Sequence, residues 1–368
     1  MDEPLPVAVI GLGAFGQLTL EALRASPLVQ VVGVSDRNAA TAEQVGRKCS
    51  LPSFSDNRSL LAQTRPAAVF LSVPPTAAPE LLSACAERGI HVWKELPLAR
   101  NLDEAVSLAD RMERAGVKFA IGTQRRFAAG YRRAKEMCGR LGRISLARSH
   151  YLFNWGPNLG WRGDKASAGG GALLELGYHC VDLLVWLLGL PSEVYGASVG
   201  GNRPDELTAD GQPLPPYDTD DTATAILRYA SGAMATVVTT RRSGPVSEEL
   251  DLHGRGGSLT ASSEACICRD PDGNVLDRVQ DEPAPQAVFR RQVEAFVRAV
   301  RAGGRQYECS ARENLLAQAV IEAIYLSDRT SQPENPERML KARNLSVEHC
   351  LSLRPGPQGQ DAPPAEPA

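Results

Sequence analysis

Residues 6–16, PVAVIGLGAFG, join a short apolar run to a glycine-rich turn. The run PVAVI suits a β-strand that is buried on both faces, and the turn has the spacing Gly-x-Gly-x-x-Gly. In this spacing Gly11 allows a tight turn, Gly13 lets the backbone approach a pyrophosphate, and Gly16 lets the next helix pack against the strand. The stretch therefore predicts a dinucleotide-binding turn.

The residues around this turn support the same prediction. Ala14 and Phe15 begin a predicted helix, whose N-terminus would offer amide donors and a positive dipole end to phosphates. A second apolar run, 29–34, leads to Asp36, which lies 20 residues after the last glycine. A carboxylate there is expected to accept a hydrogen bond from the ribose 2′-hydroxyl. It would repel a 2′-phosphate, so NAD is favoured over NADP, although Arg37 beside it could accommodate that phosphate.

Alternating strand and helix patterns continue to residue 121. The predicted strands lie near Phe54 and at 67–73, 90–93 and 117–121, and the predicted helices lie at 40–49, 78–88 and 103–115. This alternation predicts a six-stranded, doubly wound parallel sheet, the Rossmann architecture, in a first domain of residues 1–123. Ligands bind such sheets beyond the carboxyl ends of the strands, which places Pro74, Glu95 and Gln124 beside the glycine turn.

After Phe127 the pattern becomes rich in strands. They are predicted at 144–152, 193–199, 222–229, 233–240, 249–252, 258–261 and 275–279, with helices at 130–140, 286–302 and 312–327. Ser231-Gly232 predicts a hairpin between two of the strands. We therefore expect a second α/β domain, residues 124–345, with a large, mostly antiparallel open sheet. Residues 354–368 have almost no apolar content and are expected to be disordered.

Residues 169–188, GGGALLELGYHCVDLLVWLL, predict one helix that is apolar on nearly every side and hence buried. Glu175, His179, Asp182 and Trp186 share one face of it. Buried ionisable groups are costly unless they are paired or face a cavity, so the stripe is either a structural pair or a site. His179 is the best acid–base candidate, because its ordinary pKa lies near neutrality. Glu175 could orient it or share its proton, whereas Asp182 is favoured as a structural partner.

The composition excludes several other classes of protein. A chain of 368 residues predicts two domains, and a net charge of -3 gives no broad attraction to nucleic acid or to an anionic membrane. The eight cysteines form no pairs with zinc-ligand spacing, so no metal site is predicted. The sequence shows no signal peptide and no apolar run that approaches a membrane span. These features favour a reduced, cytoplasmic protein.

Several stretches together resemble the Gfo/Idh/MocA oxidoreductase family, which includes glucose–fructose oxidoreductase and inositol dehydrogenase. They are KELP at 94–97, WRGDKASAGGG at 161–171 followed by ALLELGYHCVD, YASGAMATV at 229–237, FVRAVRAG at 296–303 and AIYLSDRT at 323–330. The resemblance extends from Val7 to about Leu340. It implies an NAD(P)-dependent oxidoreductase of carbohydrate metabolism, which transfers a hydride from a sugar, polyol or related hydroxylated substrate and uses His179 as acid and base.

The family motifs match this sequence with two changes. The usual Glu-Lys-Pro is Glu95, Leu96 and Pro97 here, so its lysine is missing, and Lys94 is an uncertain substitute. The usual aspartate four residues before the histidine is Glu175. The resemblance also implies that Glu95 contacts the nicotinamide ribose and that Pro74 lies near the ring.

The resemblance brings four further residues to the substrate cavity: Arg126, Trp161, Arg162 and Lys165. They suit a hydroxylated or an anionic substrate, although each could equally serve surface pairing or core packing. It also implies a homo-dimer or homo-tetramer, formed through one face of the antiparallel sheet.

Two other functions remain open. One is an NAD-dependent glycoside hydrolase, which the family also contains. The other is a non-catalytic protein that senses a dinucleotide or a sugar, which the missing lysine at Leu96 favours and the retained Glu175 and His179 oppose.

Overall fold

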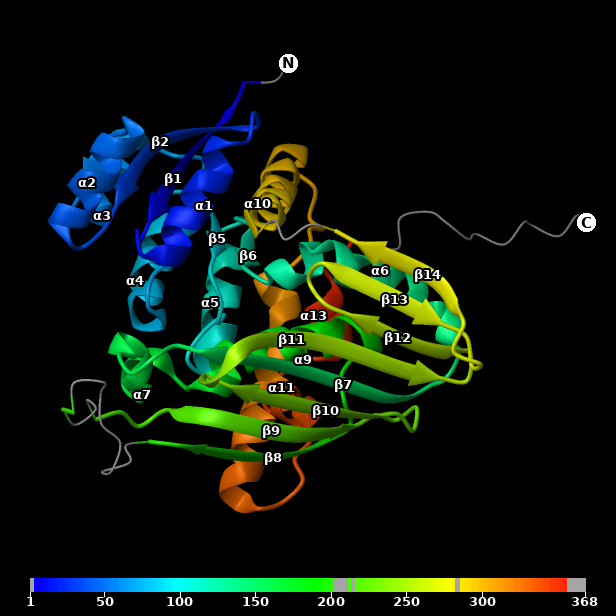
Figure 1. Cartoon of the computed structure of the whole chain (residues 1–368). Helices are drawn as coiled ribbons and strands as arrows, with labels where there is room; N and C mark the ends of the chain where they lie inside the picture. The colour runs from blue at the N-terminus through cyan, green and yellow to red at the C-terminus, as the bar shows by residue number, and fades with distance from the viewer. Residues whose placement is uncertain (1–2, 202–210, 213–215, 282–284, 356–368) are drawn as a thin grey trace, which may run out of the picture.

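A computed structural model describes residues 3–201, 211–212, 216–281 and 285–355. The chain forms two sheets, and the N-terminal third is built around the first of them (Figure 1). The tail predicted to be disordered lies outside the described residues from residue 356 onward.

The first sheet is six-stranded and entirely parallel, with the order β3-β2-β1-β4-β5-β6, which confirms the predicted Rossmann architecture. Its strands are β1 (Leu5–Ile10), β2 (Val29–Ser35), β3 (Ser53–Phe54), β4 (Ala68–Leu71), β5 (His91–Lys94) and β6 (Phe119–Ile121). The helices that alternate with them are α1 (Ala14–Arg24), α2 (Ala39–Cys49), α3 (Asn57–Thr64), α4 (Ala78–Ala86) and α5 (Leu102–Arg114). The central strands are apolar throughout because helices cover both faces of the sheet.

A helix from the far end of the chain covers part of this sheet. This helix, α10 (Pro285–Ala302), packs against α1 (Figure 1). Its Phe296 meets the ring of Phe70 edge-on, with 5.9 Å between ring centroids. The apolar stripe predicted on α10 is therefore core, and it joins the end of the chain to the N-terminal sheet.

The second sheet has eight strands in the order β14-β13-β12-β11-β7-β10-β9-β8. They are β7 (Ile144–Asn154), β8 (Glu193–Gly200), β9 (Asp220–Arg228), β10 (Met234–Thr240), β11 (Arg242–Gly254), β12 (Gly257–Ala261), β13 (Ala265–Arg269) and β14 (Val275–Gln280). Only β7 and β10 pair in parallel, so the prediction of a mostly antiparallel sheet is confirmed. The hairpin at Ser231-Gly232 is confirmed between β9 and β10.

One strand, β13, was not predicted from the sequence. In β13, Cys266 and Cys268 are both buried, and the residues between and beside them are half-buried. This is the period-two pattern of a strand, but five residues with two cysteines are too short to identify it from sequence.

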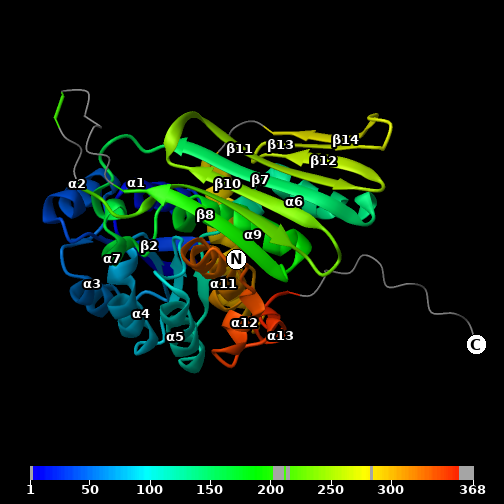
Figure 2. The same ribbon diagram turned by 90° about the horizontal axis from the view of Figure 1, so that it is seen from below.

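Helices lie on one side of the second sheet (Figures 1 and 2). They are α6 (Ala129–Met137), α9 (Gly177–Leu188) and α11 (Ala311–Thr330), with the shorter α7 (Lys165–Ala168), α8 (Ala172–Glu175), α12 (Pro336–Lys341) and α13 (Val347–Leu351) nearby. Helix α11 contacts α5 of the first domain as well as α9 and β8, so it ties the two sheets together.

The single helix predicted over 169–188 is wrong, because the chain forms α8 and α9 with a break at Leu176. The helical segments 165–175 and 177–188 meet at an angle of 54°. The start of α8 is held from outside, since the Asp220 carboxylate accepts from the amides of Gly171 at 2.7 Å and Leu173 at 2.8 Å. That cap comes from β9 and could not be read from the local sequence.

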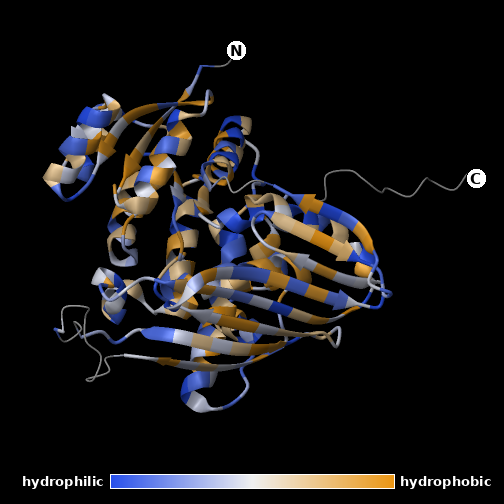
Figure 3. Cartoon of the chain, viewed as in Figure 1, coloured by the Kyte–Doolittle hydropathy of each residue, from blue (hydrophilic) through white to orange (hydrophobic). Residues whose placement is uncertain are grey.

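The opposite face of the second sheet exposes apolar side chains. Their exposure ranges from 39% at Leu146 to 54% at Val199, and the set on β7 to β10 is Leu146, Tyr195, Val199, Ile226, Met234 and Val238. Figure 3 shows hydrophobic positions along these strands. Within the described ranges no single helix is long and apolar enough to cross a membrane. Only the bent pair 165–175 and 177–188 reaches that length and hydropathy, by length and composition alone.

Candidate functional site

The glycine turn has the shape that its spacing predicts. Gly11 has a φ of 88°, and a Cβ on it would overlap the carbonyl oxygen of Ser72. A Cβ on Gly16 would overlap the carbonyl oxygen of Gly11, so helix α1 packs directly on the turn. A Cβ on Gly13, in contrast, would meet nothing within 4 Å. The backbone is therefore open where a pyrophosphate would approach and closed where helix meets strand.

Asp36 lies against this turn, as expected for a residue that reads the ribose. Its carboxylate accepts from the amide of Leu12 at 2.8 Å and from the amide of Asn38 at 2.9 Å. These two bonds fix the carboxylate at the carboxyl end of β2, beside the start of α1. Arg37 is exposed and has no partner among the described residues. An open Gly13 and a fixed acceptor at Asp36 fit a dinucleotide with a free 2′-hydroxyl.

Unpaired polar atoms gather beyond the carboxyl ends of the strands. They are buried and have no hydrogen-bond partner within the described part of the chain: Ser72 Oγ, Glu95 Oε2, Thr123 Oγ1, Gln124 Oε1, Arg125 Nε, Trp155 Nε1 and His179 Nδ1. Ser72, Glu95 and Thr123 follow the parallel strands β4, β5 and β6, whose carboxyl ends share one edge. Buried polar groups are nearly always bonded, so unpaired ones at this edge mark a place for a ligand.

The ammonium of Lys94 is hydrogen-bonded within its own loop, whereas one carboxyl oxygen of Glu95 has no partner among the described residues. Lys94 is buried, and its Nζ donates to the carbonyl oxygens of Glu95 at 2.9 Å and Pro97 at 2.5 Å. Its ammonium is therefore held by its own loop, and the expected substrate contact is not supported. Burial lowers the pKa of Lys94 to about 8. Burial raises the pKa of Glu95 to about 8, with Lys94 opposing the rise, so this carboxyl is mostly protonated at neutral pH.

His179 lies at the start of α9 with an exposure of only 7%. Its Nδ1 has no partner among the described residues, and its ring lies 5.8 Å from the ring of Tyr151. Burial, together with the positive charge of Arg125, holds its pKa well below the ordinary value for histidine. The imidazole is therefore neutral near pH 7 and able to accept a proton.

Glu175 is bonded to Arg162 and not to His179. Its Oε1 accepts from Nε of Arg162, whose guanidinium lies 4.3 Å from the ring of Trp155 and 4.4 Å from the ring of Trp161. Burial raises the pKa of Glu175, and Arg162 opposes that rise. The structure thus brings together the predicted Glu175, Trp161 and Arg162.

The other predicted residues lie around this group. Pro74 and Gln124 are at the ends of β4 and β6, where the rim was expected, and Gln124 is buried. Lys165 is exposed at the start of α7. Its main-chain amide donates to the carboxylate of Asp218 at 2.7 Å and its carbonyl accepts from the amide of Gly169 at 2.8 Å, whereas its side chain has no partner among the described residues. Within the described ranges, no group of three His, Cys, Asp or Glu side chains could hold a metal ion.

Arg126 does not lie where a substrate residue would. Its guanidinium is buried and donates to both oxygens of Asp182, at 2.8 and 2.6 Å, and to Oε1 of Glu313 at 2.6 Å. All three of its nitrogens are therefore engaged with carboxylates of this chain. The assignment of Arg126 to the substrate is therefore not supported, and the Asp182 carboxylate is its partner in the core.

The neighbouring Arg125 is the residue that sequence reasoning missed. It pairs with Glu248, and its guanidinium lies 5.1 Å from the ring of Tyr151. Both arginines belong to a 3-10 turn, Gln124–Phe127, in which consecutive side chains diverge by about 120°. One therefore enters the core and the other approaches His179. The pair Arg125-Arg126 was visible in the sequence, but only the turn separates their roles.

Comparisons with known proteins extend these observations. A model of an oxidoreductase family with an NAD-binding Rossmann fold, Gfo/Idh/MocA, matches residues 5–123, and a model of the Gfo/Idh/MocA C-terminal domain matches 131–260. An uncharacterized oxidoreductase of Synechocystis is 30% identical over 271 residues, which are 71% of this chain and 72% of that protein. Levoglucosan dehydrogenase of Pseudarthrobacter phenanthrenivorans is 28% identical over 291 residues, or 71% of this chain and 74% of that enzyme. The solved structure of a levoglucosan dehydrogenase with NADH and levoglucosan shares the fold, with a TM-score of 0.81 at 23% identity over 90% of this chain and 99% of that one.

Proposed function

This chain belongs to the Gfo/Idh/MocA family of oxidoreductases, and on that premise we propose that it oxidises a hydroxyl group with His179 as the acid–base residue. Its class is that of the NAD-binding oxidoreductases that act on sugars or polyols. The observation that supports the proposal is the state of His179: it is buried, its Nδ1 has no partner among the described residues, and burial and Arg125 hold its pKa well below the ordinary value.

The proposed cofactor is NAD in preference to NADP. The fixed carboxylate of Asp36 supports this choice, because it would accept from a ribose hydroxyl and repel a phosphate. Gly11, Gly13 and Gly16 would hold the pyrophosphate together with the amides of Ala14 and Phe15 at the start of α1. When bound, the oxidised nicotinamide supplies the hydride acceptor.

The protein residues would supply the proton chemistry. His179 is the proposed acceptor of the hydroxyl proton during oxidation, since its imidazole is neutral over the physiological pH range. Arg125 disfavours a second positive charge next to it, which keeps the imidazole in its basic form before substrate binds. Glu175 acts through Arg162 and is proposed as a positioning residue. Leu96 cannot take any part in proton transfer, so the missing lysine leaves that step to His179.

A direct test uses the purified protein with NAD and a panel of sugars, polyols and sugar acids. We expect NADH absorbance to appear with at least one substrate. His179→Asn should lower kcat/KM by about 100- to 10,000-fold while NAD still binds, because a general base contributes about that factor. NAD binding without turnover on any substrate, and without any effect of the variant, would instead indicate a sensor. Release of free sugar from aryl glycosides without net NADH would indicate the glycoside hydrolase.

The assembly and the compartment are proposed on separate grounds. The apolar side chains exposed on the outer face of the second sheet support a homo-dimer or homo-tetramer, since such a patch usually marks an interface. Val238→Lys with Val199→Lys should then shift the mass measured by light scattering toward the monomer. All eight cysteines are free thiols, which supports a reduced, cytoplasmic environment.

A further inference from the structure

The Arg162 guanidinium is held between two indole rings. Its central carbon lies 4.3 Å from the ring of Trp155 and 4.4 Å from the ring of Trp161, so aromatic rings lie close to the cation in two directions. Such contacts restrict the rotamers of a long side chain and remove water from the cation. Because the rings lie over its faces, the guanidinium can still donate hydrogen bonds in its own plane.

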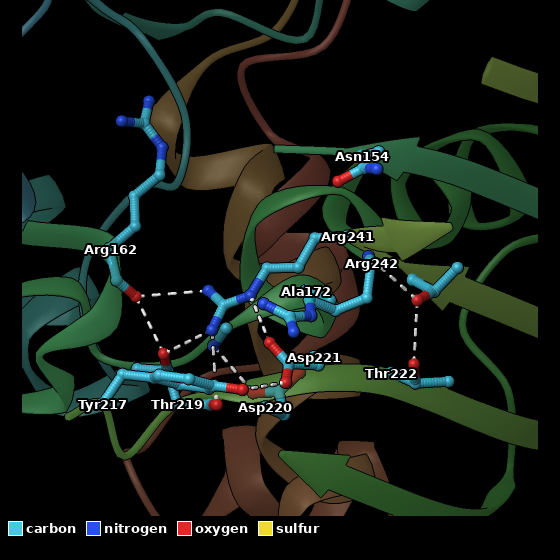
Figure 4. A network of polar contacts seen from close by, with 12 residues as sticks. Asn154, Arg162, Ala172, Tyr217, Thr219, Asp220, Asp221, Thr222, Arg241 and Arg242 are labelled. Atoms are coloured by element: carbon cyan, nitrogen blue, oxygen red, sulfur yellow. Dashed lines mark hydrogen bonds and ion pairs between the residues drawn. The ribbon is translucent and has the colours of Figure 1, made fainter. Parts of the chain in front are cut away.

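The backbone of this arginine is also fixed. The Arg162 carbonyl accepts from Thr219 Oγ1 at 2.8 Å and from Nη1 of Arg241 at 3.2 Å (Figure 4). Arg241 is fully buried, and its Nε donates to Asp221 at 3.0 Å. Figure 4 shows the Arg162 side chain directed away from this network. The network therefore sets the position of Arg162 without using its guanidinium.

Only one of the three guanidinium nitrogens has a partner. Nε donates to Glu175, and the two terminal nitrogens have none within the described part of the chain. The side chain is 21% exposed, so these nitrogens are accessible to a ligand. Two parallel N–H groups in one plane match the two oxygens of a carboxylate. A buried donor, Nε1 of Trp155, is also unpaired beside this guanidinium.

The surrounding charges favour an anion at this place. Burial raises the pKa of the Glu95 carboxyl, which weakens its repulsion of an anion. Arg125 and Arg162 both lower the pKa of Glu95, so both cations lie near this carboxyl, which the proposed function assigns to the nicotinamide end of the site. An oxidised nicotinamide adds a further positive charge there. The carboxylates of Glu175 and Glu248 are each already paired with one arginine.

We propose that the terminal nitrogens of Arg162 bind a carboxylate of the substrate, so that the preferred substrate is a polyhydroxy acid, such as a uronic or aldonic acid, and not a neutral sugar. This inference rests on the proposed function, because it names the substrate class of the same site. Trp161 and Trp155 hold the receptor rigid, and His179 remains the group that takes the hydroxyl proton.

The test compares pairs of substrates that differ only in charge, for example galactose with galacturonate and glucose with glucuronate. We expect kcat/KM with NAD to be higher for the acid of each pair. Arg162→Gln should raise KM for the acid by about 10- to 100-fold, the loss typical of one charged hydrogen-bonded pair, with little change for the neutral sugar. Arg148→Gln is the matched control, because Arg148 lies on β7, is 58% exposed and pairs with Asp251.

Further variants separate a substrate contact from an indirect effect. If Arg162 acts only by positioning Glu175, then Arg162→Gln and Glu175→Gln would each lower kcat for acid and sugar alike, and the proposal would be wrong. Equal or better turnover of the neutral sugars by the unmodified protein would also overturn it.

If neither kind of substrate reduces NAD, the proposed function fails. Calorimetric titration of the NADH complex with galacturonate still decides the binding site in that case. Binding that Arg162→Gln abolishes supports the subsite, and binding that the variant leaves unchanged, or no binding, contradicts it.

Discussion

Glu175 accepts a hydrogen bond from Arg162 and pairs with it rather than with His179, although it lies four residues before the histidine. The break at Leu176 separates the two residues into different helices, so the neighbour relation of a continuous helix does not hold. Within the described residues no hydrogen bond joins Glu175 to His179, and the imidazole Nδ1 is unpaired. The carboxylate therefore orders the arginine, and the histidine is left for a ligand.

This relation predicts unequal effects of two conservative substitutions. Glu175→Gln should lower kcat/KM by about tenfold or less, because the amide oxygen still accepts from Arg162 and the histidine keeps its place. His179→Asn should lower it about 100- to 10,000-fold. The acidic limb of the pH profile should lie below the ordinary pKa of histidine and be lost only in the His179 variant. Steady-state kinetics over a pH range would measure both effects. Equal losses would mean that the two residues act as one unit.

The glycine turn predicts a separation of stability from binding. Gly16→Ala should lower the free energy of unfolding by about 1 to 3 kcal/mol, because the new Cβ overlaps the carbonyl of Gly11. Gly13→Ala should leave stability nearly unchanged, since nothing lies within 4 Å and the φ of -65° suits alanine. The same variant should weaken NAD binding, because the methyl group enters the space where a pyrophosphate would approach. Urea unfolding and calorimetry with NAD measure the two quantities, and an equal loss of stability in both variants would contradict this account.

Asp36 predicts the choice between the two dinucleotides. Asp36→Ala should lower the affinity for NAD by about 10- to 100-fold, because a charged hydrogen bond to the ribose is lost. The affinity for NADP should fall much less or even rise, because the repulsion between the carboxylate and the 2′-phosphate disappears. Glu43→Ala is the control, since this carboxylate lies on α2, is 64% exposed and pairs with Arg47. Equal weakening of both dinucleotides by Asp36→Ala would exclude a ribose contact.

Glu95 predicts a dependence of stability on pH. Burial raises its pKa from 4.5 to about 8, so the folded state keeps a proton that the unfolded state releases between these values. The contribution of this group to the free energy of unfolding is therefore full below the unfolded pKa and falls as pH rises toward 8. Glu95→Gln removes that loss, so its Tm relative to the unmodified protein should rise between about pH 5 and about pH 7.5. Glu80→Gln, at a carboxylate whose side chain is 75% exposed, should show no such trend.

The buried cluster of Arg126, Asp182 and Glu313 predicts a structural effect only. Arg126→Met would leave both carboxylates buried without their partner and should cost about 3 to 5 kcal/mol of stability. Arg132→Met removes an exposed pair with Glu308 and should cost less than about 1 kcal/mol. If Arg126→Met does not fold, Asp182→Asn gives a milder loss of the same kind. A rise in substrate KM without a change in unfolding would restore Arg126 to the substrate site.

Local sequence patterns predicted much of the fold, because the strands, helices and turns concerned depend on residues that are neighbours in the chain. The six parallel strands and the hairpin at Ser231-Gly232 follow from hydrophobic period and turn residues. The strand β13 and the division of 169–188 into two helices do not. The first is too short to show a pattern. In the second, the start of α8 is set by the Asp220 carboxylate, which comes from β9 and accepts from the amides of Gly171 and Leu173.

By itself the sequence determined the shape of the glycine turn, because Gly11, Gly13 and Gly16 act through spacing along one strand–turn–helix unit, and it predicted Asp36 as the ribose contact. It also predicted His179 as the acid–base group. Only the tertiary structure decided which charged side chains pair with each other. Arg162 binds Glu175, Arg126 joins the core, Lys94 is held by its own loop, and Arg125 approaches His179. Apart from that of Lys94, each of these contacts joins residues from separate elements. Burial and nearby charge decide which groups pair, and both are defined only when those elements pack together.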